Sequence, residues 1–166
     1  EAGHFVDLFE LNEKVGARIA ELTRNEGACV TAGAACGLLL CAAAVMTGCD
    51  RALIDRLPDT TGMKNEILVH RCQRLGWQRP PRLSGARLVE FGGEEGTRRE
   101  DLLSAFTERT AAVLYFASPL FERHALPLPE VISLAHERGV PVIVDAAANL
   151  PPASNLWAYT GMGADL

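Results

Sequence analysis

A chain of 166 residues, 48% of them hydrophobic, is long and apolar enough to bury one core, which excludes an intrinsically disordered protein. The formal net charge of −5 disfavours a nucleic-acid partner, because such proteins bind phosphates through basic surfaces. The longest apolar run, 37–46, is too short to span a bilayer, and the five cysteines lack CxxC spacing. We therefore expect a cytoplasmic protein with neither a disulfide framework nor a metal site.

The beginning of the chain contains helical patterns around one short apolar segment. Residues 5–22 place apolar side chains mostly three or four positions apart with charged residues between them, which predicts an amphipathic helix. Residues 27–31 predict a short strand, and the small residues 31–35 predict a turn that opens an Ala- and Leu-rich helix ending at Thr47. A further short helix is predicted over 50–57.

The turn formed by Thr31, Ala32, Gly33 and Ala34 is a candidate anion site. A helix N-terminus presents free backbone N–H groups and the positive end of the helix dipole, and small side chains let a phosphate approach closely. The same small residues would also suit a helix packed tightly against a sheet, and the pattern alone leaves both interpretations open. The sequence contains no GxGxxG or GxxxxGK(S/T) motif, which disfavours ordinary dinucleotide and Walker-type nucleotide sites.

The predicted strand 66–69 delivers two polar residues at its end. Arg71 could bind a carboxylate or phosphate through paired N–H bonds, or it could be a solvated surface residue. His70 could stack on a flat ring or titrate near neutral pH, whereas a lone histidine is more often structural. The residue pattern does not decide between these alternatives.

The second half of the chain alternates between strands and helices. Strands are predicted over 86–91 and 110–116, helices over 98–107 and 129–138, and a loop or short irregular helix over 76–84. Strands separated by helices predict a mostly parallel sheet with crossover helices on its faces, which is an α/β fold.

Residues 140–144 are apolar and mostly β-branched, which predicts a strand buried on both faces of a parallel sheet. This strand ends at Asp145, which three alanines follow. Ligands of open α/β sheets bind at the carboxyl ends of the strands, so Asp145 is a candidate site residue. It could equally be the N-cap of whatever follows the strand, because Asp is a favoured N-cap residue.

Several stretches, taken in their order and spacing, resemble one known family. They are TAGAACGLLL at 31–40, LPDTTGMKNEILVHR at 57–71, SGARLVEFG at 84–92, RTAAVLYFA at 109–117 and LPLPEVISLAHERGVPVIVDAAANLPP at 126–152, followed by the closing GADL. Over essentially its whole length the chain resembles the pyridoxal-phosphate enzymes of fold type I, in the branch of selenocysteine synthase (L-seryl-tRNA selenium transferase) and D-glucosaminate-6-phosphate ammonia-lyase. The resemblance implies a three-layer αβα architecture with a mostly parallel sheet. Residues 1–166 would form an incomplete large domain, without its last strands and without the small C-terminal domain.

The resemblance also implies residue roles, with pyridoxal 5'-phosphate as the cofactor. The turn from Thr31 to Ala34 would hold the cofactor phosphate with its backbone amides. Asp145 would be the catalytic carboxylate that pairs with the pyridinium nitrogen and keeps it protonated, so that the ring can accept electrons from the substrate. Ala147 would lie against the face of the ring.

The resemblance assigns fewer residues to substrate binding, and it assigns no residue of this chain as the catalytic lysine. Arg71 matches an arginine of the selenocysteine synthase pattern and would bind an anionic group of the substrate. His70 departs from that pattern, which leaves its proposed stacking or substrate-binding role open. In this family the Schiff-base lysine follows the strand that comes after the Asp strand, and Leu166 would lie at the start of that strand, so the resemblance places the lysine beyond Leu166. Neither Lys14 nor Lys64 fits its position.

The resulting hypothesis is an enzyme that eliminates or replaces a group at the β-carbon of a small anionic amino acid, as an ammonia-lyase or a selenocysteine-synthase-like transferase. The acidic balance favours the lyase, because tRNA binding draws on Lys and Arg, although tRNA stays an open alternative. A homodimer or higher homo-oligomer is expected, with Phe5 and Phe9 of the first helix at the interface. The alternative of a different class is a non-enzymatic α/β domain that binds a phosphorylated ligand at a helix N-terminus.

Overall fold

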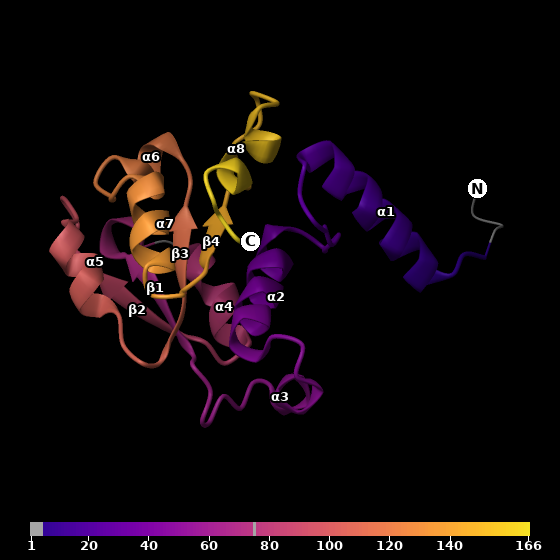
Figure 1. Cartoon of the computed structure of the whole chain (residues 1–166), viewed down its shortest axis with the longest axis horizontal. Helices are drawn as coiled ribbons and strands as arrows, with labels where there is room; N and C mark the ends of the chain where they lie inside the picture. Colours follow the sequence, from indigo (N-terminus) through magenta and orange to yellow (C-terminus); the bar gives the residue numbers. More distant parts are fainter. Residues whose placement is uncertain (1–4, 75) are drawn as a thin grey trace.

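A four-stranded parallel sheet forms the centre of the molecule in the computed structural model, which describes residues 5–74 and 76–166 (Figure 1). Its strand order is β2-β1-β3-β4, and each neighbouring pair is parallel. The strands are β1 (Glu66–His70), β2 (Arg87–Phe91), β3 (Thr110–Phe116) and β4 (Val142–Asp145). The predicted α/β class and the four strands that form this sheet are confirmed.

Helices connect and flank these strands. They are α1 (Leu8–Thr23), α2 (Ala34–Thr47), α3 (Arg51–Arg56), α4 (Arg79–Leu83), α5 (Arg99–Ala105), α6 (Pro119–Glu122), α7 (Leu128–His136) and α8 (Asn155–Gly161), with 3-10 turns η1 (Arg71–Gln73) and η2 (Gly76–Gln78). Every predicted helix is present, whereas the short helices α6 and α8 were not predicted. Within the described residues, no helix combines the length and the apolar character that a membrane span requires.

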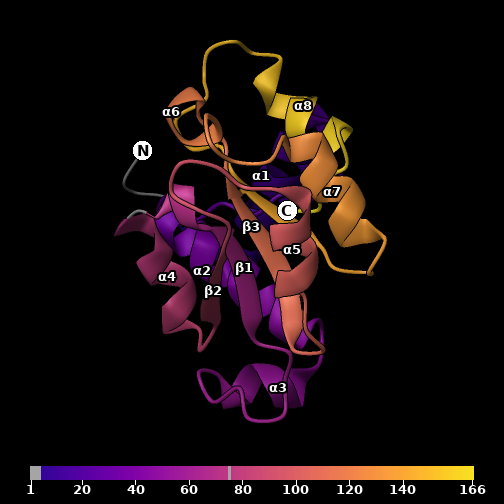
Figure 2. The same ribbon diagram turned by 90° about the vertical axis from the view of Figure 1, so that its left-hand side faces the viewer.

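The sheet is covered on both faces, which gives three layers (Figure 2). On one face, α5 and α7 bury Leu102, Val131 and Leu134 against Leu68 of β1 and Val113 of β3. The opposite face packs against α2, with α4 beside it. There Leu38, Ala42 and Met46 of α2 meet a second set of strand residues: Ile67, Val69, Ala112, Leu114, Phe116 and Ile143. The apolar runs predicted as buried strands are thus buried on both sides, and the predicted three-layer architecture is confirmed.

The prediction of a strand at 27–31 is wrong. Residues 27–30 have no regular secondary structure and make no backbone–backbone hydrogen bonds with any described residue. Their apolar and β-branched composition suits a strand, but an extended segment becomes a strand only when a neighbour supplies hydrogen-bonding partners. No described strand lies beside this segment.

The far edge of β4 is already occupied by the last residue. Leu166 donates its backbone N–H to Val142 O (3.3 Å) and accepts a hydrogen bond from Val144 N (2.9 Å). This alternation along one strand is the parallel pattern, so Leu166 lies where a strand next to β4 would begin.

Helix α1 projects away from the layered body (Figure 1). Its N-cap Asp7 accepts hydrogen bonds from the backbone of Phe9 and Glu10, and its buried residues are Gly16 and Ala20. A side chain at Gly16 would collide with the carbonyl of Ala28, which explains the glycine at this contact. Most of the apolar residues that predicted this helix are exposed: Phe5, Leu8, Phe9, Leu11, Val15 and Leu22.

Candidate functional site

The carboxylate of Asp145 lies at the carboxyl end of β4, on the face of the sheet that α2 covers. Side chains alternate along a strand, and Ile143 packs against α2 while Val142 and Val144 pack on the opposite face, so Asp145 shares the α2 face. Its Oδ1 accepts a hydrogen bond from Ala147 N (3.1 Å), and no described Lys, Arg or His lies within salt-bridge distance of it.

This geometry decides part of the question that the sequence left open. The residues after Asp145 form a turn, and the next helix, α8, begins at Asn155. Asp145 therefore caps a turn and is not the N-cap of a helix. Its second oxygen has no partner among the described groups, so the half-buried carboxylate can accept a further hydrogen bond.

The N-terminus of α2 lies at the same edge of the sheet, because α2 runs opposite to the strands (Figure 1). Its N-cap is Gly33, with φ 118° and ψ 169°, and no side chain caps the helix. The Thr31 hydroxyl donates to Gly33 O (2.9 Å) and so leaves the first N–H groups of the helix free. Ala32, Gly33 and Ala34 are exposed, and a Cβ at Gly33 would meet no atom within 4 Å.

The exposure of this turn separates the two interpretations of its small residues. Tight packing of α2 on the sheet is achieved further along the helix by Leu38, Ala42 and Met46. Ala32, Gly33 and Ala34 are exposed, and at Gly33 no neighbouring atom requires the absence of a side chain. The geometry therefore favours an open anion site at this helix N-terminus.

His70 lies in the core and is separated from the other candidate residues. Its side chain is 0% exposed, its Nε2 accepts a hydrogen bond from Leu126 N (3.2 Å), and its ring lies 4.4 Å from Phe91 and 5.5 Å from Tyr115. Burial lowers the pKa of His70 to about 4, so the ring is neutral at physiological pH. This burial fits the structural alternative, and the geometry gives no support to a substrate-binding role.

Arg71 begins the turn η1 directly after β1 and remains accessible. Its side chain is 46% exposed, and its Nε lies 3.5 Å from Oε2 of Glu90 on β2. Neighbouring strands are about 4.8 Å apart, so the end of β1, which precedes Arg71, lies roughly 10 Å from the end of β4 along the same edge. Sequence reasoning did not select Glu90, because its pairing with Arg71 depends on the register of β1 and β2.

A cavity of about 1110 Å³ adjoins the α2 N-terminus. The segment 24–31, the α2 residues Gly37, Leu40, Cys41 and Ala44, and residues of α8 and the following segment line it, with Thr31 among them. Arg24 and Trp157 both line this cavity, and the guanidinium of Arg24 lies 4.0 Å from the centre of the Trp157 ring. The sequence did not predict the cavity, because segments far apart in the chain form its walls.

Two curated proteins are similar to this chain, although no protein-family model matches it. It is 37% identical over 168 residues to the 5'-C-glycyluridine monooxygenase-decarboxylase of a Streptomyces species, and the matched region covers 97% of this chain and 41% of that protein. It is 34% identical over 170 residues to the D-glucosaminate-6-phosphate ammonia lyase of Salmonella typhimurium, and the matched region covers 99% of this chain and 45% of that protein. The chain thus spans less than half the length of these curated relatives.

Solved structures agree with this similarity. The structure of D-glucosaminate-6-phosphate ammonia-lyase superposes with a TM-score of 0.91 at 33% identity, over 99% of this chain and 45% of the other. The chain has the fold of the pyridoxal-phosphate enzymes of fold type I. Distant members of fold type I match more loosely, such as the aspartate aminotransferase of Thermotoga maritima, with a TM-score of 0.51 at 19% identity over 86% of this chain and 38% of the other.

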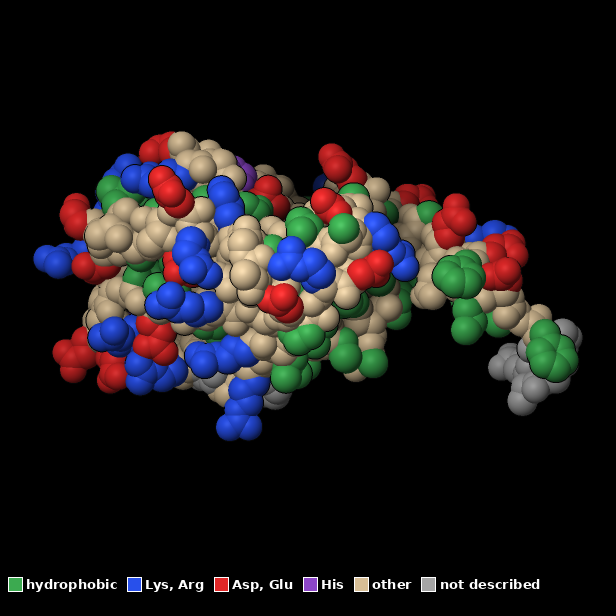
Figure 3. All heavy atoms as spheres, turned by 90° about the horizontal axis from the view of Figure 1, so that it is seen from below, with side chains coloured by type: hydrophobic (Ala, Val, Ile, Leu, Met, Phe, Trp, Pro, Cys, Tyr) green, Lys and Arg blue, Asp and Glu red, His purple; other side chains and the backbone are tan. Residues whose placement is uncertain are grey.

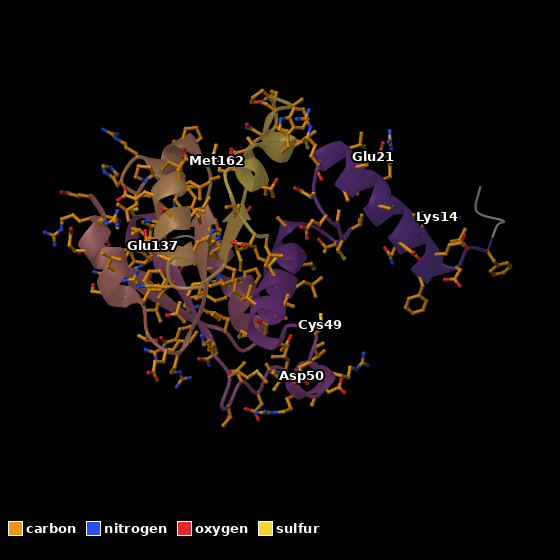
Figure 4. All side chains as sticks on the ribbon, viewed as in Figure 1. Lys14, Glu21, Cys49, Asp50, Glu137 and Met162 are labelled. Carbon is orange, nitrogen blue, oxygen red and sulfur yellow. The ribbon has the colours of Figure 1, made fainter. Side chains whose placement is uncertain are left out.

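The fold type I chain contributes no lysine to the edge where Asp145 and the α2 N-terminus lie. Lys14 lies on the projecting helix α1 and pairs with Glu10 at 2.5 Å (Figure 4). Lys64 precedes β1 and therefore lies at the amino edge of the sheet. These are the two lysines of the sequence, and neither reaches the candidate site.

Proposed function

We propose that the chain is part of the cofactor-binding domain of a pyridoxal-phosphate enzyme that eliminates or replaces a group at the β-carbon of an amino acid. The observation that supports this most is one juxtaposition on the α2 face at the carboxyl edge of the sheet. The free N–H groups at the α2 N-terminus and the carboxylate of Asp145, which has no cationic partner among the described residues, lie on that face. The similarity to an ammonia lyase over 99% of the chain supports the reaction class.

The residues present fit this cofactor. When bound, pyridoxal phosphate supplies an electron sink for the carbanion formed at the Cα of an amino acid. The α2 N-terminus would hold the phosphate through its backbone N–H groups and the helix dipole. Asp145 would hold a proton at the ring nitrogen, since a nearby carboxylate favours the charged form of that nitrogen. The exposed Ala147 leaves room for the ring.

The remaining parts of the site follow from the same proposal. Arg71, half exposed at the same edge, would bind an anionic group of the substrate. The lysine that attaches the cofactor would come from a part of the protein outside these residues. The complete enzyme would be a cytoplasmic homodimer or higher homo-oligomer acting on a small anionic amino acid, without a nucleic-acid partner.

The name of the Streptomyces relative includes a decarboxylation, so relatives at this similarity differ in the reaction that they catalyse. Ammonia release and carbon dioxide release should therefore both be followed in the complete protein. If the complete protein takes up no pyridoxal phosphate and binds inorganic phosphate alone, the non-enzymatic phosphate-binding alternative is supported.

The deciding experiment is Asp145→Asn in the complete protein. Asn keeps the shape of the side chain and its bond to Ala147 N but removes the charge, so turnover should fall by roughly two orders of magnitude or more while the melting temperature stays close to wild type. The matched control is Asp50→Asn at the N-cap of α3, where Asn caps as well as Asp (Figure 4). Turnover of Asp145→Asn near that of Asp50→Asn would contradict the cofactor assignment.

A further inference from the structure

Glu90 lies at the carboxyl edge of the sheet on the same face as Asp145. It is opposite Val69 in the β1–β2 register, and Leu88, two residues earlier on the same face of β2, packs toward α2, which places Glu90 on that face as well. Its side chain is 21% exposed. A mostly buried carboxylate needs partners, because an unpaired charge is costly to bury.

Arg74, three positions after Arg71, supplies both partners. Its Nε donates to Oε1 of Glu90 (2.8 Å), and its Nη2 donates to Oε2, which makes the pair bidentate. The hydrogen bonds from Arg74 are the main reason why the pKa of Glu90 lies below its usual value, with smaller effects from the charges of Arg71 and Arg82. Glu90 is therefore ionised at neutral pH, and both of its oxygens are engaged.

Arg71 interacts with the same carboxylate more weakly than Arg74 does. Its contact with Glu90 is a charge contact of 3.5 Å through Nε, and no hydrogen bond from its guanidinium to any described residue is formed. Two guanidinium groups thus face one carboxylate. The excess positive charge falls on Arg71, whose Nη groups remain available to a ligand.

We propose that Arg74 is a positioning residue, which holds Glu90 and thereby keeps Arg71 free for an oxyanion of the substrate, phosphate or carboxylate. The proposal rests on the substrate-binding role of Arg71 in the proposed function and deepens it. Without Arg74, the carboxylate of Glu90 would capture Arg71 in a bidentate pair and neutralise it. The binding of the oxyanion would then be lost although Arg71 itself is unchanged.

The test is a cycle of variants in the complete protein loaded with cofactor, with inorganic phosphate and acetate as probes in calorimetric titrations. Arg71→Gln should weaken the binding of the preferred probe by about tenfold, because it removes the charge-assisted contact with the probe. Arg74→Gln should weaken it by about as much, because Glu90 then pairs with Arg71. Glu90→Gln should bind it at least as tightly as wild type. The double variant Arg74→Gln/Glu90→Gln should regain affinity to within about twofold of wild type, because nothing then competes for Arg71.

The control is Glu95→Gln, which removes an exposed carboxylate from the loop after β2 that has no salt bridge to any described residue, and it should leave the affinity unchanged. With the substrate, Arg74→Gln should raise KM and leave kcat and the cofactor absorbance near wild type. Stronger binding of phosphate than of acetate identifies a phosphate group of the substrate, and the reverse identifies a carboxylate. Should Arg74→Gln fail to fold, Arg74→Lys keeps the charge but loses the bidentate geometry, and a smaller loss in the same direction is expected.

Wild-type affinity in Arg74→Gln overturns the proposal. A double variant as weak as Arg74→Gln also overturns it, because the loss would then be structural. Unchanged affinity in Arg71→Gln shows that the oxyanion binds elsewhere and overturns it too. A complete protein that takes up no pyridoxal phosphate would contradict the proposed function instead, while the affinities of all the variants for phosphate could still be compared, so the two failures are distinguishable.

Discussion

His70 and Arg71 are adjacent in the chain but have opposite surroundings. His70 is the last residue of β1 and its side chain points into the α5/α7 face, between Phe91 and Tyr115. With Nε2 accepting from Leu126 N, the neutral ring carries its hydrogen on Nδ1, which has no hydrogen-bond partner among the described residues. The turn η1 starts at the next residue and carries Arg71 out to the surface.

The buried ring makes the stability of the protein depend on pH. The pKa of His70 is about 4 in the folded state and about 6.5 in an unfolded chain, so between these values the unfolded state binds a proton that the folded state does not. The contribution of His70 to the free energy of unfolding is nearly constant above pH 6.5. It becomes destabilising as the pH falls from 6.5 toward 4. Between pH 7.5 and pH 5 we expect this residue to cost about 2 kcal/mol of unfolding free energy.

The measurement compares urea unfolding of the complete protein with that of His70→Gln at pH 7.5 and pH 5. Gln can accept the same bond from Leu126 N but does not titrate, so the variant should lose less stability on acidification than wild type. His124→Gln, at an exposed position, is the control and should lose as much as wild type. If His70→Gln loses as much stability as wild type, the pH dependence does not come from His70.

At the scale of elements, the α2 N-terminus depends on the conformation of one residue. Gly33 has a φ of 118°, a region that L side chains rarely adopt, although space for a Cβ is available. This conformation turns the chain so that the first N–H groups of α2 point outward. Gly33→Ala should therefore disturb the anion site through backbone strain of about 1–3 kcal/mol and not through a collision.

We expect Gly33→Ala to weaken the binding of pyridoxal phosphate by the complete protein by about tenfold or more, which corresponds to about 1.4 kcal/mol. A spectroscopic titration of the cofactor-free protein measures this. Gly27→Ala is the control, since Gly27 lies in the preceding segment, has no strained φ, and a methyl group there would meet no atom within 4 Å. Equal affinities for the two variants would count against the α2 N-terminus as the phosphate site.

At the scale of the whole molecule, α1 is an amphipathic helix without a partner for most of its apolar face. Phe5, Leu8 and Phe9 are 106%, 65% and 89% exposed, and hydrophobic side chains are visible along the projecting helix in Figure 3. The cation–π contact between Arg24 and Trp157 connects the end of this helix to α8. An exposed apolar surface of this kind is typical of a protein–protein interface.

The complete protein should sediment as a dimer or larger oligomer at micromolar concentration, with α1 in the interface. Phe9→Glu places a charge on that surface and should shift the protein toward monomer, whereas Leu120→Glu, at a residue of α6 that is 82% exposed, should leave the sedimentation coefficient unchanged. A wild-type protein that sediments as a monomer, or a Phe9→Glu variant that remains fully associated, would contradict this role of α1.

Local patterns determined the elements of this protein to a large extent. The apolar runs at 66–69, 110–116 and 140–144 contain β1, β3 and β4 because such residues suit a sheet covered on both faces, and the spacing of apolar residues located α1. The candidate positions Asp145 and Thr31–Ala34 were selected for the same reason, since a strand end and a helix start are local features.

Only the tertiary structure decided which of these features have partners. The segment 27–31 has strand-like residues but no neighbouring strand among the described residues, and no local pattern can supply one. The burial of His70 and the pairing of Glu90 with Arg74 depend on the face of the sheet and on the β1–β2 register. Hydrogen bonds and charge pairs between residues far apart in the chain are set by how the layers pack, because the sequence specifies the type of each side chain but not which distant group it meets.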